Sequence, residues 1–183
     1  MRIEHIDEVL PHIQGRPDFV VARRDGYTVV DYTFTQPDTF DHPVRLECRG
    51  IKFGTDGRVI GRPFHKFYNI SEKAHTQPHL IDLLQPHLLM EKVDGSMVHP
   101  CIVHDKLVLM TRMGHTDVAK AAEKMITPEL YRGLREQLEA GVTPILEYTA
   151  PTNRIIIRYE RPQLTLLALR QTISGAYIPF YHV

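Results

Sequence analysis

Short runs of alternating apolar and polar residues make up most of the chain, a pattern typical of strands joined by tight turns. Hairpins are expected over 19–34 and 44–62, each with an Asp-Gly pair at its turn. A third hairpin is expected to join 88–93 to 97–112, again with Asp-Gly between its strands. Residues 164–170 (LTLLALR) form a continuous apolar run, which indicates a buried strand.

Helical patterns lie between these hairpins. Short helices are expected over 3–13 and 78–84. Residues 116–139 form the clearest helical stretch and predict two helices, the second with Thr127 as its N-cap and Pro128 at its first position. Because helices are grouped between mostly antiparallel hairpins, the sequence predicts an α+β fold with mostly antiparallel sheets.

Composition is that of one ordinary globular domain. The 183 residues are 43% hydrophobic and 24% charged, and no linker-like stretch divides them, so a single domain over 1–183 is expected. No apolar run approaches the ~20 residues of a membrane span, so no membrane partner is expected. Two cysteines, Cys48 and Cys101, cannot build a disulfide framework, which favours a reducing cytoplasm.

Opposite charges balance along the chain, because 22 Lys and Arg residues face 22 Asp and Glu residues. A bulk electrostatic grip on nucleic acid needs a basic excess, so any contact with RNA or DNA is expected to be local. The candidate patches are the pair Arg23-Arg24 and the trio Arg154, Arg158 and Arg161. Both are also typical of a solvated face.

Residues 90–98 (MEKVDGSMV) place a lysine two residues before an Asp-Gly pair. A plain hairpin turn is one explanation, since two other Asp-Gly pairs suggest nothing more. The alternative is that Lys92 is a nucleophile, whose ammonium pKa must then fall through burial or nearby cations. The end of an apolar strand (LLMEKV) would supply the burial, and Gly95 would let a ligand approach the backbone.

Three further stretches set polar residues in apolar surroundings. ECRGIKF places Arg49 at a strand start, RPFHKFYNISE places Lys66 among aromatic residues, and ILEYTAPTNRIIIRY places Glu147 inside an apolar strand that turns at Pro-Thr-Asn. An unpaired carboxylate there is costly, so each stretch predicts either a polar ligand or a structural partner. In the structural alternative, Arg49 pairs with Glu47 and Lys66 extends its ammonium to solvent. Glu147 would then bridge to an arginine.

Together these stretches resemble one family. The order ECRG-x-x-F, PF-x-KF-[FY]-N, K-x-D-G-S, EY-x-APTNRI and a strand ending in Leu-x-x-Arg is similar to the RNA ligases of bacteriophages that repair cut tRNA. Those enzymes are covalent nucleotidyltransferases, like DNA ligases and mRNA capping enzymes. Lys-x-Asp-Gly alone is a weak signal, but five stretches in order, from about residue 44 to 175, are specific.

The resemblance implies an ATP-grasp-like nucleotidyltransferase core and an ATP-dependent RNA ligase. It implies that Lys92 attacks the α-phosphate of ATP, releases pyrophosphate and carries the adenylate. The adenylate then passes to the 5′-phosphate of an RNA end, with tRNA as one candidate, and a 3′-hydroxyl displaces it. Mg²⁺ is the implied metal, with its protein ligands unassigned. The implied nucleotide-binding residues are Arg49, Lys66, Tyr68, Glu91, Asp94, Gly95, Arg112 and Glu147.

By the same resemblance, Arg49 and Glu147 would hold the ribose, while Lys66 and Tyr68 would act near the phosphates or line the pocket. The residues flanking Lys92 would help to form the adenylate pocket. Arg112, in TRMG, is the loosest match, because only its place after the lysine hairpin identifies it.

The match lacks two stretches that members of the family carry. Neither a Glu-Gly strand that helps to bind metal nor a Lys-x-Lys strand that contacts the triphosphate has a counterpart. The sequence therefore predicts a partial adenylyltransferase domain with its C-terminal strands missing. Three alternatives follow: an N-terminal piece of a ligase, one half of a split enzyme with a partner chain, or a non-catalytic module that binds nucleotide or RNA. The expected location is the cytoplasm of a bacterial or phage-infected cell.

Overall fold

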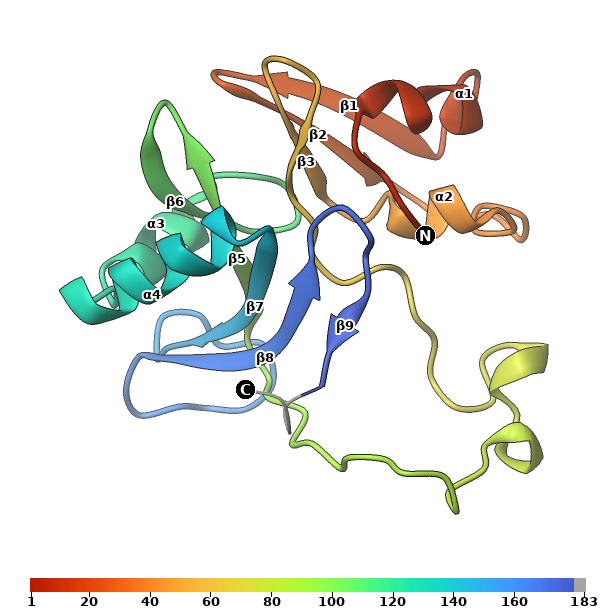
Figure 1. Ribbon diagram of the computed structural model, residues 1–183. Helices are drawn as coiled ribbons and strands as arrows, with labels where there is room; N and C mark the ends of the chain where they lie inside the picture. The colour runs from red at the N-terminus through yellow and green to blue at the C-terminus, as the bar shows by residue number, and fades with distance from the viewer. Residues whose placement is uncertain (180–183) are drawn as a thin grey trace.

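Two antiparallel sheets form the body of the structure, a computed structural model that describes residues 1–179 (Figure 1). The first sheet has the order β1-β2-β3-β4, with strands β1 (Phe19–Arg24), β2 (Tyr27–Tyr32), β3 (Ile51–Gly54) and β4 (Val59–Gly61). The second sheet has the order β6-β5-β7-β8-β9, with strands β5 (Ser96–Val103), β6 (Lys106–Met110), β7 (Val142–Thr149), β8 (Gln163–Gln171) and β9 (Tyr177–Ile178). The predicted α+β class with antiparallel sheets is therefore confirmed.

The two longest helices, α3 (Asp117–Glu123) and α4 (Pro128–Glu139), cover the second sheet (Figure 1). Thr127 accepts a hydrogen bond from the Leu130 N–H, and Pro128 begins α4, so the predicted start of this helix is confirmed. The remaining helical segments are short: η1 (Ile6–Glu8), α1 (Leu10–Ile13), α2 (Pro43–Glu47), η2 (Ala74–Thr76) and η3 (Pro78–Leu80), where η marks a 3₁₀ turn. Within residues 1–179, no helix is both long enough and apolar enough to cross a membrane.

Each sheet buries its own apolar core, and a third cluster joins the two. The first core lies under β2 and β3, against the N-terminal helices. The second lies between β5, β6 and β7 and the helices α3 and α4. In the third cluster, Tyr27 and Val29 of β2 meet Cys101 of β5 and Met110 of β6. The third cluster therefore packs the two sheets directly against each other.

Two of the three predicted Asp-Gly turns are confirmed. Gly26 and Gly57 have φ of +80° and +82°, as tight hairpin turns require. The third prediction was wrong, because residues 88–93 form no strand and β5 begins only after Gly95. A Cβ at Gly95 would collide with the carbonyl oxygen of Tyr148. This glycine therefore permits a close approach to β7 instead of making a hairpin turn.

Three other predicted elements are shorter than expected. The hairpin predicted over 44–62 begins with α2, and only its later part pairs as β3 and β4. The helix predicted over 3–13 is divided into η1 and α1, and Val9 lies between them as the cap of both. In the stretch 143–159 the strand ends at Thr149 and the predicted turn at Pro-Thr-Asn (151–153) is confirmed, but residues 154–159 form no strand.

Between β4 and β5 the chain makes a long excursion away from the sheets (yellow to green in Figure 1). The helix predicted over 78–84 is reduced here to the single turn η3. Leu80, Leu83 and Leu84 are 58%, 65% and 96% exposed, so residues 78–84 bury little apolar surface. Short helices are unstable in water without such packing, which explains the difference.

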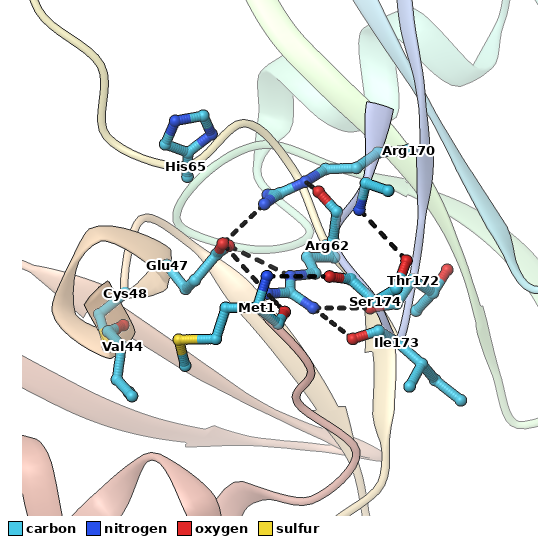
Figure 2. Close-up of polar contacts among 12 residues, drawn as sticks. Met1, Val44, Glu47, Cys48, Arg62, His65, Arg170, Thr172, Ile173 and Ser174 are labelled. Atoms are coloured by element: carbon cyan, nitrogen blue, oxygen red, sulfur yellow. Dashed lines mark hydrogen bonds and ion pairs between the residues drawn. The ribbon is translucent and has the colours of Figure 1, made fainter. Parts of the chain in front are cut away.

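A buried carboxylate, that of Glu47, joins the first sheet to the second (Figure 2). Arg62, directly after β4, donates Nε to Glu47 at 3.1 Å, and Arg170 of β8 donates Nη2 to it at 2.7 Å. Burial acts to raise the pKa of Glu47, but the Arg62 hydrogen bond and the Arg170 charge outweigh it and hold this pKa below its usual range. The carboxylate is therefore charged at neutral pH.

The other donors of the two guanidinium groups bind backbone carbonyl oxygens. Arg62 donates to Ile173 at 2.6 Å and to Met1 at 2.7 Å (Figure 2). Arg170 donates to Gly175 at 2.9 Å. A buried ion pair is stable only when such additional bonds satisfy its members. We call Glu47, Arg62 and Arg170 the Glu47 cluster.

Replacing Glu47 by glutamine leaves two buried guanidinium charges without their counter-ion. We expect Glu47→Gln to lower the free energy of unfolding by about 3–5 kcal/mol at neutral pH, measured by urea denaturation. The folded-state pKa of Glu47 lies below the ordinary 4.5, so the wild-type advantage is complete above that pH. It should disappear as the pH falls through the lower folded-state pKa and the carboxylate is protonated.

Glu139→Gln is the matched control, because Glu139 pairs with Arg135 on the exposed surface of α4. Exposed pairs of this kind contribute less than about 1 kcal/mol. Equal losses in the two variants would contradict a special role for the Glu47 cluster.

Candidate functional site

A cleft of about 800 Å³ is lined by residues of both sheets and of the excursion between them. Its lining contains most of the residues that the sequence singled out: Arg49, Lys66, Tyr68, Glu91, Lys92, Gly95 and Glu147. Among the residues that line this cleft within 1–179, Asp94 and Arg112 are not found. Asp94 instead bonds to residues 156, 157 and 159, while Arg112 lies over Tyr32, which lines the cleft.

Lys92 lies in extended chain just before β5 and its side chain is exposed. The expectation of a lysine buried at a strand end was therefore wrong, because residues 88–93 form no strand and Leu88, Leu89 and Met90 are themselves more than half exposed. What fixes the backbone after Lys92 is Gly95, whose N–H donates to Glu147 Oε1 at 3.0 Å. Lys92 is thus placed by the attachment of the following residues to β7.

Glu147 is the buried carboxylate of the cleft, 9% exposed on a strand whose residues are all buried. Burial raises its pKa, while the Gly95 N–H and the charge of Lys92 oppose the shift. The predicted structural alternative, a bridge from Glu147 to an arginine, is not what the structure shows. The Gly95 amide is its partner instead, so the carboxylate lies within the electrostatic reach of Lys92.

Asp94 holds a loop against the lysine segment. Its Oδ2 accepts hydrogen bonds from the N–H groups of Ile156 and Ile157 at 2.7 and 2.6 Å, and these lower the pKa of the carboxyl. Its own N–H donates to the Tyr159 hydroxyl at 3.0 Å. The carboxylate predicted for the adenylate pocket therefore serves to tie residues 154–161 to the backbone beside Lys92.

Two cations of the first half of the chain enter the cleft beside aromatic rings. The guanidinium of Arg49 lies 5.6 Å from the ring centre of Phe67, and the ammonium of Lys66 lies 4.7 Å from that of Tyr68. The predicted pairing of Arg49 with Glu47 is wrong, because Glu47 is occupied by the Glu47 cluster. Nη1 of Arg49 is buried and has no hydrogen-bond partner within the described part of the chain. Such a buried donor requires an acceptor, which a water or a ligand oxygen supplies.

Arg112 stands behind the cleft. It forms an ion pair with Asp31 at 3.0 Å and lies over the Tyr32 ring at 4.6 Å, and Tyr32 itself lines the cleft. Burial raises the pKa of Asp31 to about 6 despite this partner. The backbone of Arg112 is held by the buried ammonium of Lys52, which donates to its carbonyl oxygen at 3.0 Å.

The structure adds an aromatic wall that the sequence did not indicate. Tyr177 of β9 stacks on Phe64 with ring centres 5.9 Å apart, and its hydroxyl bonds to His65 at 2.8 Å. The guanidinium of Arg170 lies 4.9 Å from the Tyr177 ring, which connects this wall to the Glu47 cluster. Lone aromatic residues carry no local signal of this role, because the stacking joins segments more than a hundred residues apart.

Asn153 was quoted in the sequence pattern without a role, and the structure supplies one. Its Nδ2 donates to the Tyr148 carbonyl at 3.0 Å and to Ser96 Oγ at 3.1 Å. The Pro-Thr-Asn turn is thereby fastened to the start of β5, next to Gly95. The Thr-Asn-Arg and Asp-Gly-Ser stretches therefore pack as one unit beside Lys92.

Comparison with known proteins identifies a family. The family model for RNA ligase matches residues 47–181. A protein named "Putative RNA ligase" from Thermovibrio ammonificans is 34% identical over 177 residues, covering 94% of this chain and 46% of that protein. RNA ligase 1 of Bacteriophage TS2126 is 31% identical over 169 residues, covering 86% of this chain and 43% of that protein.

A solved structure supports the fold. An archaeal ATP-dependent RNA ligase aligns with a TM-score of 0.61 at 16% identity, over 96% of this chain and 45% of that one. At this identity the likeness shows a shared nucleotidyltransferase fold. The chain spans less than half the length of these relatives.

Gly95 offers a test of how the lysine segment is held. We expect Gly95→Ala to lower the free energy of unfolding by about 1–3 kcal/mol, because its Cβ must displace the Tyr148 carbonyl. Gly133→Ala is the control, since nothing lies within 4 Å of a Cβ there and an alanine inside α4 should raise stability by about 0.5–1 kcal/mol. Urea denaturation measures both, and a gain in both variants would refute the close approach.

Proposed function

This chain belongs to the RNA ligase family, and we propose that it joins RNA ends with ATP through an adenylate carried on Lys92. The observation that carries the proposal is the buried, unpartnered Nη1 of Arg49 in the cleft that also contains Lys92 and Lys66. Three cations in one cleft suit a polyphosphate, and a phosphate or ribose oxygen would satisfy the orphaned donor.

The proposed first step takes place at Lys92 Nζ. In its neutral form the amine attacks the α-phosphate of ATP, so that a nitrogen–phosphorus bond forms and the bond to pyrophosphate breaks. The exposure of Lys92 lets its proton pass to solvent. An oxygen of the RNA 5′-phosphate then displaces the lysine from the adenylate. Finally a 3′-hydroxyl attacks that 5′-phosphate and releases AMP.

The neighbouring residues act by position and charge. Arg49 and Lys66 would neutralise phosphate oxygens, or in the case of Arg49 hold the ribose, while Glu147 would accept a hydrogen bond from a ribose hydroxyl. Tyr68, Glu91 and the aromatic wall of Phe64 and Tyr177 would complete the nucleotide pocket.

Mg²⁺ fits this donor set. Glu72, Glu91 and Glu147 line the cleft, but within residues 1–179 no three His, Cys, Asp or Glu side chains come close enough to hold an ion. Mg²⁺ commonly binds through one or two carboxylates together with substrate phosphates and water, which is the arrangement these residues allow. When bound, the ion supplies charge neutralisation at the phosphates.

The alternative is a nucleotide- or RNA-binding module that needs a partner chain to act. One observation favours it: the excursion before Lys92 exposes Leu84, Leu88 and Leu89. Exposed apolar residues grouped in this way are typical of a surface that another polypeptide covers. On the resemblance, the ends of a cut tRNA are the proposed RNA for either version.

Intact-protein mass after incubation with ATP and Mg²⁺ separates the two versions. We expect wild type to gain the mass of one adenylate and Lys92→Ala to gain none, because no other nucleophile occupies that position. Lys106→Ala removes an exposed lysine on β6, outside the cleft, and should gain the adenylate like wild type. An unmodified wild type, with its fold confirmed by circular dichroism, would support the partner-dependent module.

Arg49 can be tested by a change that preserves its charge. Arg49→Lys should slow adenylate formation by roughly 10²–10³-fold, since lysine cannot reproduce the guanidinium fork at a preorganised phosphate or ribose site. The rate is measured by transfer of label from α-labelled ATP to protein. Arg58→Lys is the control, because Arg58 is exposed and lies outside the cleft. A rate for Arg49→Lys equal to that of the control would remove Arg49 from the proposed site.

A further inference from the structure

Residues 154–161, which we call the arginine loop, carry charge that the folded chain does not use. Arg154, Arg158 and Arg161 are exposed, and within residues 1–179 none of them forms an ion pair. The loop has one acidic residue, Glu160, so it carries a local positive excess on a chain whose net charge is zero.

The same loop exposes consecutive apolar side chains. Ile155, Ile156 and Ile157 are 57%, 75% and 51% exposed. Single exposed apolar residues are ordinary, but three in a row between arginines indicate a surface that contacts another molecule. The backbone of Ile156 and Ile157 is nevertheless fixed, because Asp94 accepts their N–H groups.

The position of the loop links it to the reactive lysine. Asp94 follows Lys92 by two residues, and two residues of extended chain span about 7 Å. The Tyr159 hydroxyl adds a second attachment, to the Asp94 N–H at 3.0 Å. A molecule that binds the arginine loop therefore lies within a few nucleotide lengths of Lys92.

We propose that the arginine loop binds single-stranded RNA next to the end that reacts at Lys92. The inference rests on the proposed function and names the surface that holds its RNA. The arginines would pair with successive phosphates, and the isoleucines would contact the faces or sugars of unstacked bases. RNA suits the loop better than a protein does, because three unpaired arginines at a protein interface would need three matching acids.

RNA binding without ATP tests the proposal independently of catalysis. The probe is a fluorescent single-stranded RNA oligonucleotide with a 5′-phosphate, followed by anisotropy over a series of salt concentrations. The variant Arg154→Gln/Arg158→Gln/Arg161→Gln should bind at least ten-fold more weakly. Its slope of log affinity against log salt should be shallower by about 2, because three phosphate contacts are lost.

The control removes the same charge elsewhere, as Arg58→Gln/Arg132→Gln/Arg135→Gln, from residues outside the cleft whose side chains are 41–74% exposed. It should keep the wild-type slope to within about 1. An equal loss of affinity and slope in both variants would show nonspecific attraction and overturn the proposal. Unchanged binding in the loop variant would also overturn it, and would leave the isoleucines as a surface for a polypeptide.

A second measurement does not depend on variants. RNA carrying 4-thiouridine near its 5′ end is irradiated with the wild-type chain, and the crosslinked peptide is identified by mass spectrometry. Crosslinks within 154–161 are expected, whereas crosslinks only at distant surfaces would refute the assignment. Failure of adenylate formation in the mass experiment would count against Lys92 chemistry, while these binding results would still decide whether the loop holds RNA.

Discussion

The Glu47 carboxylate, shared by two buried arginines, is the interaction on which the arrangement of the cleft depends. Each member of the Glu47 cluster lies on a segment next to residues that line the cleft. Glu47 ends α2 and leads directly to Arg49, Arg62 precedes the segment that carries Phe64 and Lys66, and Arg170 lies on β8, which forms the opposite wall. The charge-assisted hydrogen bonds of the Glu47 cluster join these segments, together with the stacking of Phe64 on Tyr177. Hydrogen bonds of fixed geometry hold the segments that line the cleft at fixed distances from one another.

The sequence was most informative about residues whose side chain or backbone preference suits one specific chemical or conformational role. Lys92, Arg49, Lys66 and Glu147, which the motifs singled out, line one cleft, and the proposed nucleotide chemistry would use cations, a carboxylate and a nucleophile placed together in this way. The hairpin turns at 25–26 and 56–57 were predicted from local backbone preference alone. Such preferences act over a few residues and need no knowledge of the rest of the fold.

Sequence reasoning failed for residues whose steric limits or hydrogen-bond partners lie in a distant part of the chain. Gly95 resembles the other turn glycines in its neighbours, yet its constraint is the carbonyl oxygen of Tyr148 on another strand. The partners of Glu47 lie 15 and 123 residues away, so Arg170 could be recognised only as the end of a matching motif. Asp94 has its expected neighbours but a different role, because its carboxylate is engaged by backbone amides that no local pattern reveals.

The long excursion between β4 and β5 has a consequence for the continuity of the chain. It is the exposed connection between the two sheets, and residues 80–91 are exposed throughout. A protease that cuts there would break the chain into one fragment bearing Glu47 and Arg62 and another bearing Arg170. The Glu47 cluster and the packing of Tyr27 against Met110 are noncovalent contacts between these two fragments. The two sheets are therefore connected by noncovalent contacts as well as by the chain that runs past Lys92.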